Sequence, residues 1–427
     1  MDDPAAAAPF TALPWRSFTS KLTESMFRFS LFPAFLFLAG GSRAAEFTMD
    51  SAVTYALAHN PDLAAARLGA DQAKARLLQT GGLANPELET EVRPNLAGRE
   101  FSVSFGLSQK FPLTQRLRLE KAVSEAGVAM AELEIAAAAR SLTTQVREIV
   151  LKLQSLHTRQ QILNKQQSAA RDLAAAMTKT AAAGESPPLE SAQVELEVSQ
   201  LAILALQGTS ERASLTGSLR PLLGSPATEP IIISGTLPAP SMPAFRPDPA
   251  GHPDYLVALT KAGAARRSIE LARANRWEDL TVGVAYERSH IYDAGAGMER
   301  ENMAVLRFSL PLPLKRHNAG HLAESVATSE RTTLEAAATA ARLRAEAAAA
   351  FDEMKALAAI HLQTSTQLLP LAEALETRFT QLQQNGQAAF PDVLRARQQR
   401  LAMESAALDA RRDFHLAKLR YQAAGGL

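Results

Sequence analysis

The chain of 427 residues contains no cysteine, which excludes disulfide scaffolds, thiolate metal sites and a lipid-anchoring cysteine. It has almost no excess charge of either sign, because 45 Lys and Arg stand against 44 Asp and Glu. No basic field is therefore available to bind nucleic acid. Aromatic residues make up only 6%, while alanine is abundant, a composition typical of long, closely packed helices. No nucleophile elbow, phosphate-binding glycine loop or pair of catalytic carboxylates occurs, so we expect neither an enzyme nor a bound cofactor.

Long apolar runs are also missing. The one apolar segment near the start, from Leu31 to Leu38, follows Arg28 and precedes small residues that end at Ala44. This order is that of a secretory signal peptide, and the segment is shorter than the ~20 residues that cross a bilayer, although an N-terminal anchor is the competing interpretation. We assign 1–44 to a signal peptide, with 1–25 as an extension from an upstream start codon, because Met26 directly precedes the charged segment.

Four stretches alternate between apolar and polar side chains, which is the period of a β-strand. The first two, 86–93 and 101–108, flank a turn, and the second two, 280–287 and 304–310, flank a polar loop at 289–302. The alternation predicts two β-hairpins with one apolar face. The opposite face of these strands carries Glu87, Glu89, Glu91, Glu287 and Arg307.

Such two-faced strands fit a barrel wall with lipid outside and water inside. A soluble antiparallel sheet uses the same alternation, so the local pattern does not separate the two. Two hairpins are too few to close a barrel, and closure would require several chains. We take the glutamates as candidate lumen residues, where they form either a stripe that attracts cations or an ordinary water-wetted surface.

Helical periodicity fills the remaining chain, and its order repeats. We expect helices over 49–78, 117–182, 189–219, 255–275, 319–384 and 392–422, with breaks at Gly184 and Gly386. A shift of 192 residues relates Pro61 to Pro253 and Leu88 to Leu280, which indicates an internal duplication. We place the two repeats at 45–224 and 254–427, with a Pro-rich linker over 225–253 that contains a short strand near 230–234.

The order of these segments resembles that of the TolC-like outer membrane efflux proteins over nearly the whole mature chain. The motifs that carry the resemblance are His59-Asn60-Pro61, His252-Pro253-Asp254-Tyr255, Leu310-Pro311-Leu312-Pro313-Leu314, Pro391-Asp392-Val393-Leu394-Arg395-Ala396 and Leu419-Arg420-Tyr421. The Leu-Pro-Leu exit and the missing lipid cysteine are most similar to the cobalt, zinc and cadmium type of channel. The fold class implied is mainly α with a small β part.

The resemblance implies a homotrimer with a twelve-stranded barrel in outer-membrane lipid and a periplasmic α-helical tunnel in a Gram-negative cell. It also implies passive efflux of heavy-metal cations or drugs, together with a periplasmic adaptor and an inner-membrane RND pump. In this family the helical turns form the periplasmic tip, which places Gly184, Gly386, Asp392 and Arg395 at a gate. Arg395 stands where the family has its second acidic residue, and an N-cap is the competing role for Asp392.

Two other protein classes share parts of this pattern. A periplasmic adaptor would carry one helical hairpin instead of a duplicated pair, and an exported coiled-coil structural protein would need the four alternating stretches to be incidental.

His317 and His321 have the i, i+4 spacing of metal ligands, but no carboxylate motif accompanies them, so we expect no metal site there.

Overall fold

We examined a computed structural model of the chain, which describes residues 45–94, 100–182, 188–226, 229–293, 297–313 and 318–425. The contacts divide the chain into Met1–Arg43 and Ala44–Leu427, and everything below concerns the second unit. The predicted signal peptide, Gly184 and His317 lie outside the described residues.

The helices of the first half are α1 (Met49–His59), α2 (Pro61–Gln79), α3 (Arg116–Ala182) and α4 (Pro188–Leu223). The predicted single helix over 49–78 is wrong, because the chain breaks at Asn60. Pro61 has no backbone N–H and begins a new helix, whose Leu63 N–H is capped by the Asn60 side chain at 2.8 Å. The amide of Asn60 also donates to the carbonyl of Leu222 at 3.0 Å, so the break ties α2 to the end of α4.

The second half contains α5 (Pro253–Ala274), α6 (Ala319–Gln363), α7 (Leu369–Gln384) and α8 (Phe390–Gly425). The predicted helix over 319–384 is interrupted by a π-helical turn, η2, at Thr364–Leu368. Pro370 follows directly, and a proline clashes with the preceding turn of a regular α-helix, which the wider turn relieves. The matching part of α3 has no such turn, so the two halves differ here.

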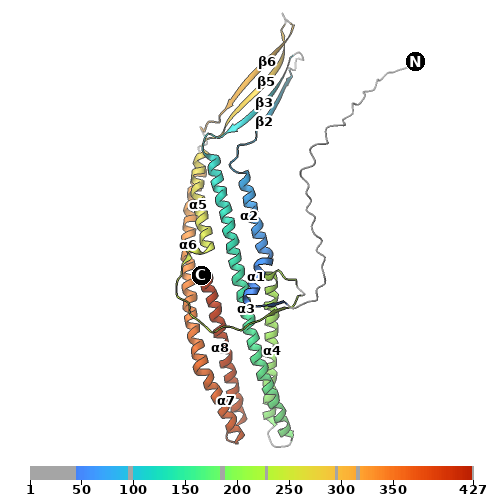
Figure 1. Cartoon of the computed structure of the whole chain (residues 1–427), viewed down its shortest axis with the longest axis vertical. Coiled ribbons are helices and arrows are strands. Elements are labelled where there is room, and N and C mark those ends of the chain that lie inside the picture. The colour runs from blue at the N-terminus through green and yellow to red at the C-terminus, as the bar shows by residue number, and fades with distance from the viewer. Residues whose placement is uncertain are drawn as a thin grey trace, which may run out of the picture. The chain divides into compact units, whose positions relative to one another are not determined.

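The strands β2 (Glu87–Pro94), β3 (Phe101–Phe111), β5 (Leu280–Asp293) and β6 (Gly297–Ser309) form one antiparallel sheet in the order β2-β3-β5-β6. The two predicted hairpins are confirmed. The predicted loop over 289–302 is wrong, because β5 and β6 stay paired up to Asp293 and Gly297. The sheet lies at one end of the long helices, and the turn between α7 and α8 lies at the other (Figure 1).

A strap of extended chain crosses the helices between these two ends. The short strand β4 (Ile231–Ile233), at the predicted position, pairs in parallel with β1 (Ala45–Phe47), and a 3-10 turn, η1 (Pro249–Gly251), ends the strap before α5. We call residues 234–248 the belt. Belt carbonyls accept hydrogen bonds from Gln154 of α3 and from Arg411, His415 and Tyr421 of α8.

The largest buried cluster lies behind β1 and β4. Apolar side chains of α1, α3 and the end of α4 fill it, among them Val146, Val150, Leu219 and Leu223, which have no exposed surface. This close-packed cluster holds α1, α3 and α4 together near the middle of the helices.

Candidate functional site

The sheet carries its apolar side chains on an uncovered face. Leu88, Leu107, Val284 and Leu306 are register partners, one from each strand, and each is more than half exposed. Neighbouring rows add further exposed apolar side chains, namely Val92, Phe101, Phe105, Phe111, Tyr286 and Phe308. A sheet in water buries this kind of face, so a different environment or partner must cover it.

The opposite face is polar and partly buried. Ser104, Ser108 and Ser289 are each at most 7% exposed, and they share this face with the predicted lumen residues. The sheet therefore has the reverse of a soluble arrangement, with small polar groups inside and large apolar groups outside.

Charged side chains on the polar face form a network across the strands. Glu87 pairs with Lys110 at 2.6 Å, and Glu91 pairs with Arg93 at 2.8 Å. The members of the network other than these pairs are Glu89, Ser108, Glu287 and Arg307. The structure thus connects four of the five predicted lumen residues, Glu89, Glu91, Glu287 and Arg307, through ion pairs, while Glu87 forms a separate pair with Lys110.

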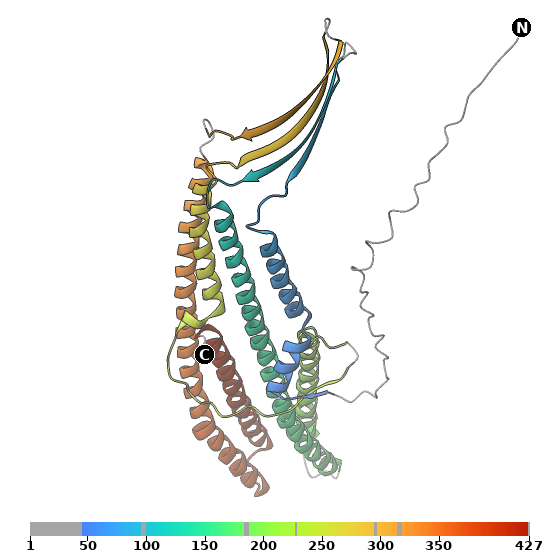
Figure 2. The ribbon, with the colours of Figure 1, turned by 45° about the horizontal axis from the view of Figure 1, so that its top comes forward.

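The sheet curves toward this polar face. Arg307 of β6 contacts Glu89 of β2 at 3.2 Å, although three inter-strand spacings, about 14 Å on a flat sheet, separate their strands. A Cβ atom added to Gly106 would lie 3.0 Å from the Cβ of Ala285, well below the usual ~4.5–5.5 Å of paired residues. All four strands follow the same arc (Figure 2). Small residues at these positions make the curvature sterically feasible.

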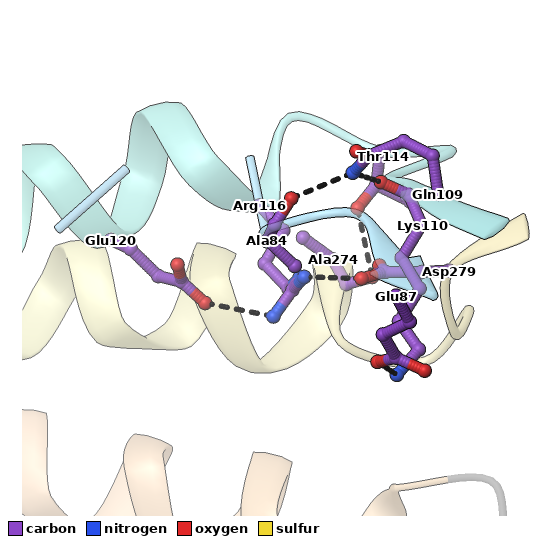
Figure 3. A network of polar contacts seen from close by, with 9 residues as sticks. All are labelled: Ala84, Glu87, Gln109, Lys110, Thr114, Arg116, Glu120, Ala274 and Asp279. Carbon is purple, nitrogen blue, oxygen red and sulfur yellow. Dashed lines mark hydrogen bonds and ion pairs between the residues drawn. The ribbon is translucent and has the colours of Figure 1, made fainter. Parts of the chain in front are cut away.

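Polar contacts join the base of the sheet to the helices (Figure 3). Arg116, at the start of α3, binds Asp279 before β5 at 2.7 Å and Glu120 one turn along α3 at 3.2 Å. Gln109 of β3 donates to the carbonyl of Ala84, and Thr114 donates to the carbonyl of Ala274. The first and second halves of the chain are therefore joined where the sheet meets the helices.

The turn between α7 and α8 is built around Gly386. Its φ is +72°, and the amides of Gly386 and Gln387 donate to the carbonyls of Gln383 and Leu382, which together form a Schellman motif. Asp392 lies in the first turn of α8 and not at its N-cap, since the helix begins at Phe390. Arg395 lies 3.6 Å from Asp392 on the same helix face, so the acid at this turn is neutralised within the chain.

A second charged group lies farther along α8. Glu376 of α7 contacts Arg397 at 3.3 Å and Arg400 at 2.7 Å, and all three side chains are less than 30% exposed. Sequence reasoning missed this cluster, because its members are separated along the chain and only the α7–α8 packing brings them together.

Metal ligands do not converge in the described ranges. No group of three or more His, Cys, Asp or Glu side chains there could hold an ion. His321 lies 3.5 Å from Glu324 on an exposed face of α6, which is an ordinary surface pair. Among the described helices, none has both the length and the apolar character that crossing a membrane requires.

Comparisons with known proteins agree with this geometry. Residues 52–225 match the family model described as outer membrane efflux protein. The cobalt-zinc-cadmium resistance protein CzcC of Cupriavidus metallidurans is 24% identical over 67% of this chain and 68% of its own length.

Solved structures of similar fold cover more of the chain. The structure of CusC has a TM-score of 0.74 at 19% identity, covering 88% of this chain and 91% of that one. The outer membrane protein VceC of Vibrio cholerae has a TM-score of 0.71 at 19% identity, covering 88% and 96%. The resemblance inferred from the sequence motifs is therefore confirmed. Residues 52–225 therefore match the outer membrane efflux protein family, and most of the chain shares the fold of CusC and VceC.

Proposed function

We propose that three copies of this efflux channel chain form the outer-membrane duct of a tripartite export system. Each copy gives four strands to a twelve-stranded barrel and its long helices to a periplasmic tunnel. The observation that carries this proposal is the sheet whose apolar face is exposed while its charged face is turned inward. Lipid covers such an outer face without cost, and the polar face then lines water.

The number of strands supports assembly from several chains. A sheet of four strands leaves the edges of β2 and β6 unpaired, and within a membrane every backbone N–H and C=O must be bonded. Pairing β6 of one copy with β2 of the next removes both edges. Three copies reach a size at which a barrel encloses a water-filled lumen.

The helices also carry apolar seams with no partner in the single chain. On α4, the exposed side chains Leu189, Leu196 and Ile203 recur every seven residues. On α7 and the π-turn before it, Leu368, Leu371 and Leu375 follow a three-four spacing. These are the spacings of helices that pack side by side, so we propose that α4 of one copy packs against α7 of the next.

The predicted site residues take defined places in this assembly. Glu87, Glu89, Glu91, Glu287 and Arg307 line the barrel lumen, while Gly386, Asp392 and Arg395 lie at the periplasmic tip, and Gly184 remains a prediction for the other tip turn. Because Arg395 neutralises Asp392, a ring of three such turns would carry little net charge. Conduction through this duct is passive, and the two repeats at 45–224 and 254–427 each supply half of the wall.

The partners proposed are a periplasmic adaptor and an inner-membrane RND pump, which supply energy and choose the cargo. The similarity to a cobalt-zinc-cadmium resistance protein favours heavy-metal cations over drugs as the exported substrate. Expression in a metal-sensitive host together with the cognate pump genes tests this point, and tolerance to cobalt, zinc or cadmium is the expected result.

The first test is fractionation of the processed protein, followed by size analysis in mild detergent. We expect an outer-membrane protein that requires detergent and migrates as a trimer. A periplasmic monomer that stays in solution without detergent would refute the channel and favour an exported coiled-coil or adaptor protein.

A further inference from the structure

A cavity of about 520 Å³ lies between α3, α4 and α8, away from the sheet and the tip turn. Five leucines line it together with polar side chains that include Gln200, Gln207 and Gln398. Three of the leucines, Leu156, Leu163 and Leu201, are buried. Leu204 and Leu401 complete the apolar lining. Pockets of this size and character hold small organic molecules.

A buried carboxylate also lines this cavity. Glu197 of α4 is 6% exposed, and its Oε2 atom has no hydrogen-bond partner among the described residues. An ionised carboxylate oxygen left unbonded in such surroundings is costly, and a bound cation would remove that cost.

The arginines of α8 pair with another acid. Arg397 and Arg400 both pair with Glu376, and neither is among the described ion pairs of Glu197. The Nη1 atom of Arg397 is itself buried without a hydrogen-bond partner among the described residues. Burial raises the pKa of Glu197, the charge of Arg397 opposes this change and the charge of Glu376 reinforces it. Arg159, which also lines the cavity, is held by Asp409, so neither it nor the arginines of α8 bond the Oε2 atom of Glu197.

We propose that this cavity is a binding site for a small hydrophobic amine, with its ammonium group on Glu197 and its apolar body along the leucines. An ammonium N–H donates to the unbonded Oε2 atom, and the charge-assisted bond is strong because Glu197 is buried. The site is formed within one chain, so it does not rest on the proposed trimer or on the cargo.

The test uses the full-length protein in lipid nanodiscs and two probes of nearly equal shape, 4-phenylbutylamine and 4-phenylbutanol. Calorimetric titration, corrected with empty nanodiscs, should show the amine binding at least tenfold more tightly than the alcohol. Glu197→Gln should weaken amine binding tenfold or more and leave the alcohol unchanged. The matched control Glu195→Gln, on the exposed face of the same helix, should stay within twofold of the unmodified protein.

A second variant keeps the test decisive if Glu197→Gln fails to fold. Leu204→Trp fills the cavity from its partly exposed wall and should abolish binding of both probes while the thermal unfolding temperature is retained. Equal affinity for amine and alcohol, or amine binding that survives either change, would overturn the site.

Discussion

The apolar face of the sheet allows a direct test of what surrounds it. Leu306 and Val305 are neighbours on β6 and point to opposite faces, with Leu306 in the row of Leu107 and Val284 and Val305 in the row of Ala285. In a membrane, Leu306→Lys places a charge in lipid at a cost of about 2–4 kcal/mol near mid-depth. Even 2 kcal/mol lowers the folded-to-unfolded ratio about thirtyfold. Val305→Lys should cost less than about 1 kcal/mol, since it places the charge in water near Glu89.

The assay is urea unfolding of the protein refolded into lipid vesicles, followed by the mobility difference between folded and heated samples in gels. Leu306→Lys should shift the transition to lower urea, and Val305→Lys should not. If the sheet were covered by water, both changes would lie at the surface and alter stability by less than about 0.5 kcal/mol. Equal transitions for the two variants would therefore refute the membrane-facing assignment.

Three further predictions concern the helices and the belt. Tyr421→Phe should lower the free energy of unfolding by about 1 kcal/mol in chemical denaturation, because the tyrosine hydroxyl accepts from the part-buried amide of Arg246 and donates to the carbonyl of Ala244. Burial lowers the pKa of His415 despite its bond to Pro238, with Lys418, Arg411 and His361 adding to the effect. As the pH falls below 6.5, the ordinary pKa of histidine, the unfolded chain binds a proton at this position before the folded chain does. The contribution of His415 to stability is therefore full above that pH and declines below it. A pH series of unfolding measurements should show a weaker decline in His415→Gln. Gly386→Ala should destabilise the α7–α8 turn by about 1 kcal/mol, because alanine rarely adopts the φ of +72° found there. Gly127→Ala should stabilise α3, because alanine favours a helix interior more than glycine does. Hydrogen exchange at the two sites separates these results.

Periodicity along the chain predicted most of the secondary structure. The alternating stretches became β2, β3, β5 and β6, and the glutamates at every second position came to one face because a strand repeats every two residues. The strands β5 and β6 are longer than predicted, because their backbone pairing continues through the polar residues of 289–302. Local polarity reports which residues meet water, and it does not show where backbone pairing stops.

Features that depend on distant contacts were not predictable in the same way. The pairing of β1 with β4 joins residues far apart in sequence, and β1 itself is only three residues long. The Glu376 cluster and the unbonded Glu197 arise only when α4, α7 and α8 are packed. The π-turn is only five residues long, so only Pro370 gave a local signal, and it did not fix the position of the turn.

The pairing of β1 with β4 also sets an order of events during secretion. A chain that emerges N-terminus first delivers Ala45–Phe47 long before Ile231–Ile233. These three residues therefore stay unpaired until the chain up to β4 has crossed the inner membrane. We infer that the middle of the molecule closes late, and that periplasmic chaperones have their longest access to β1, which the finished protein pairs with β4.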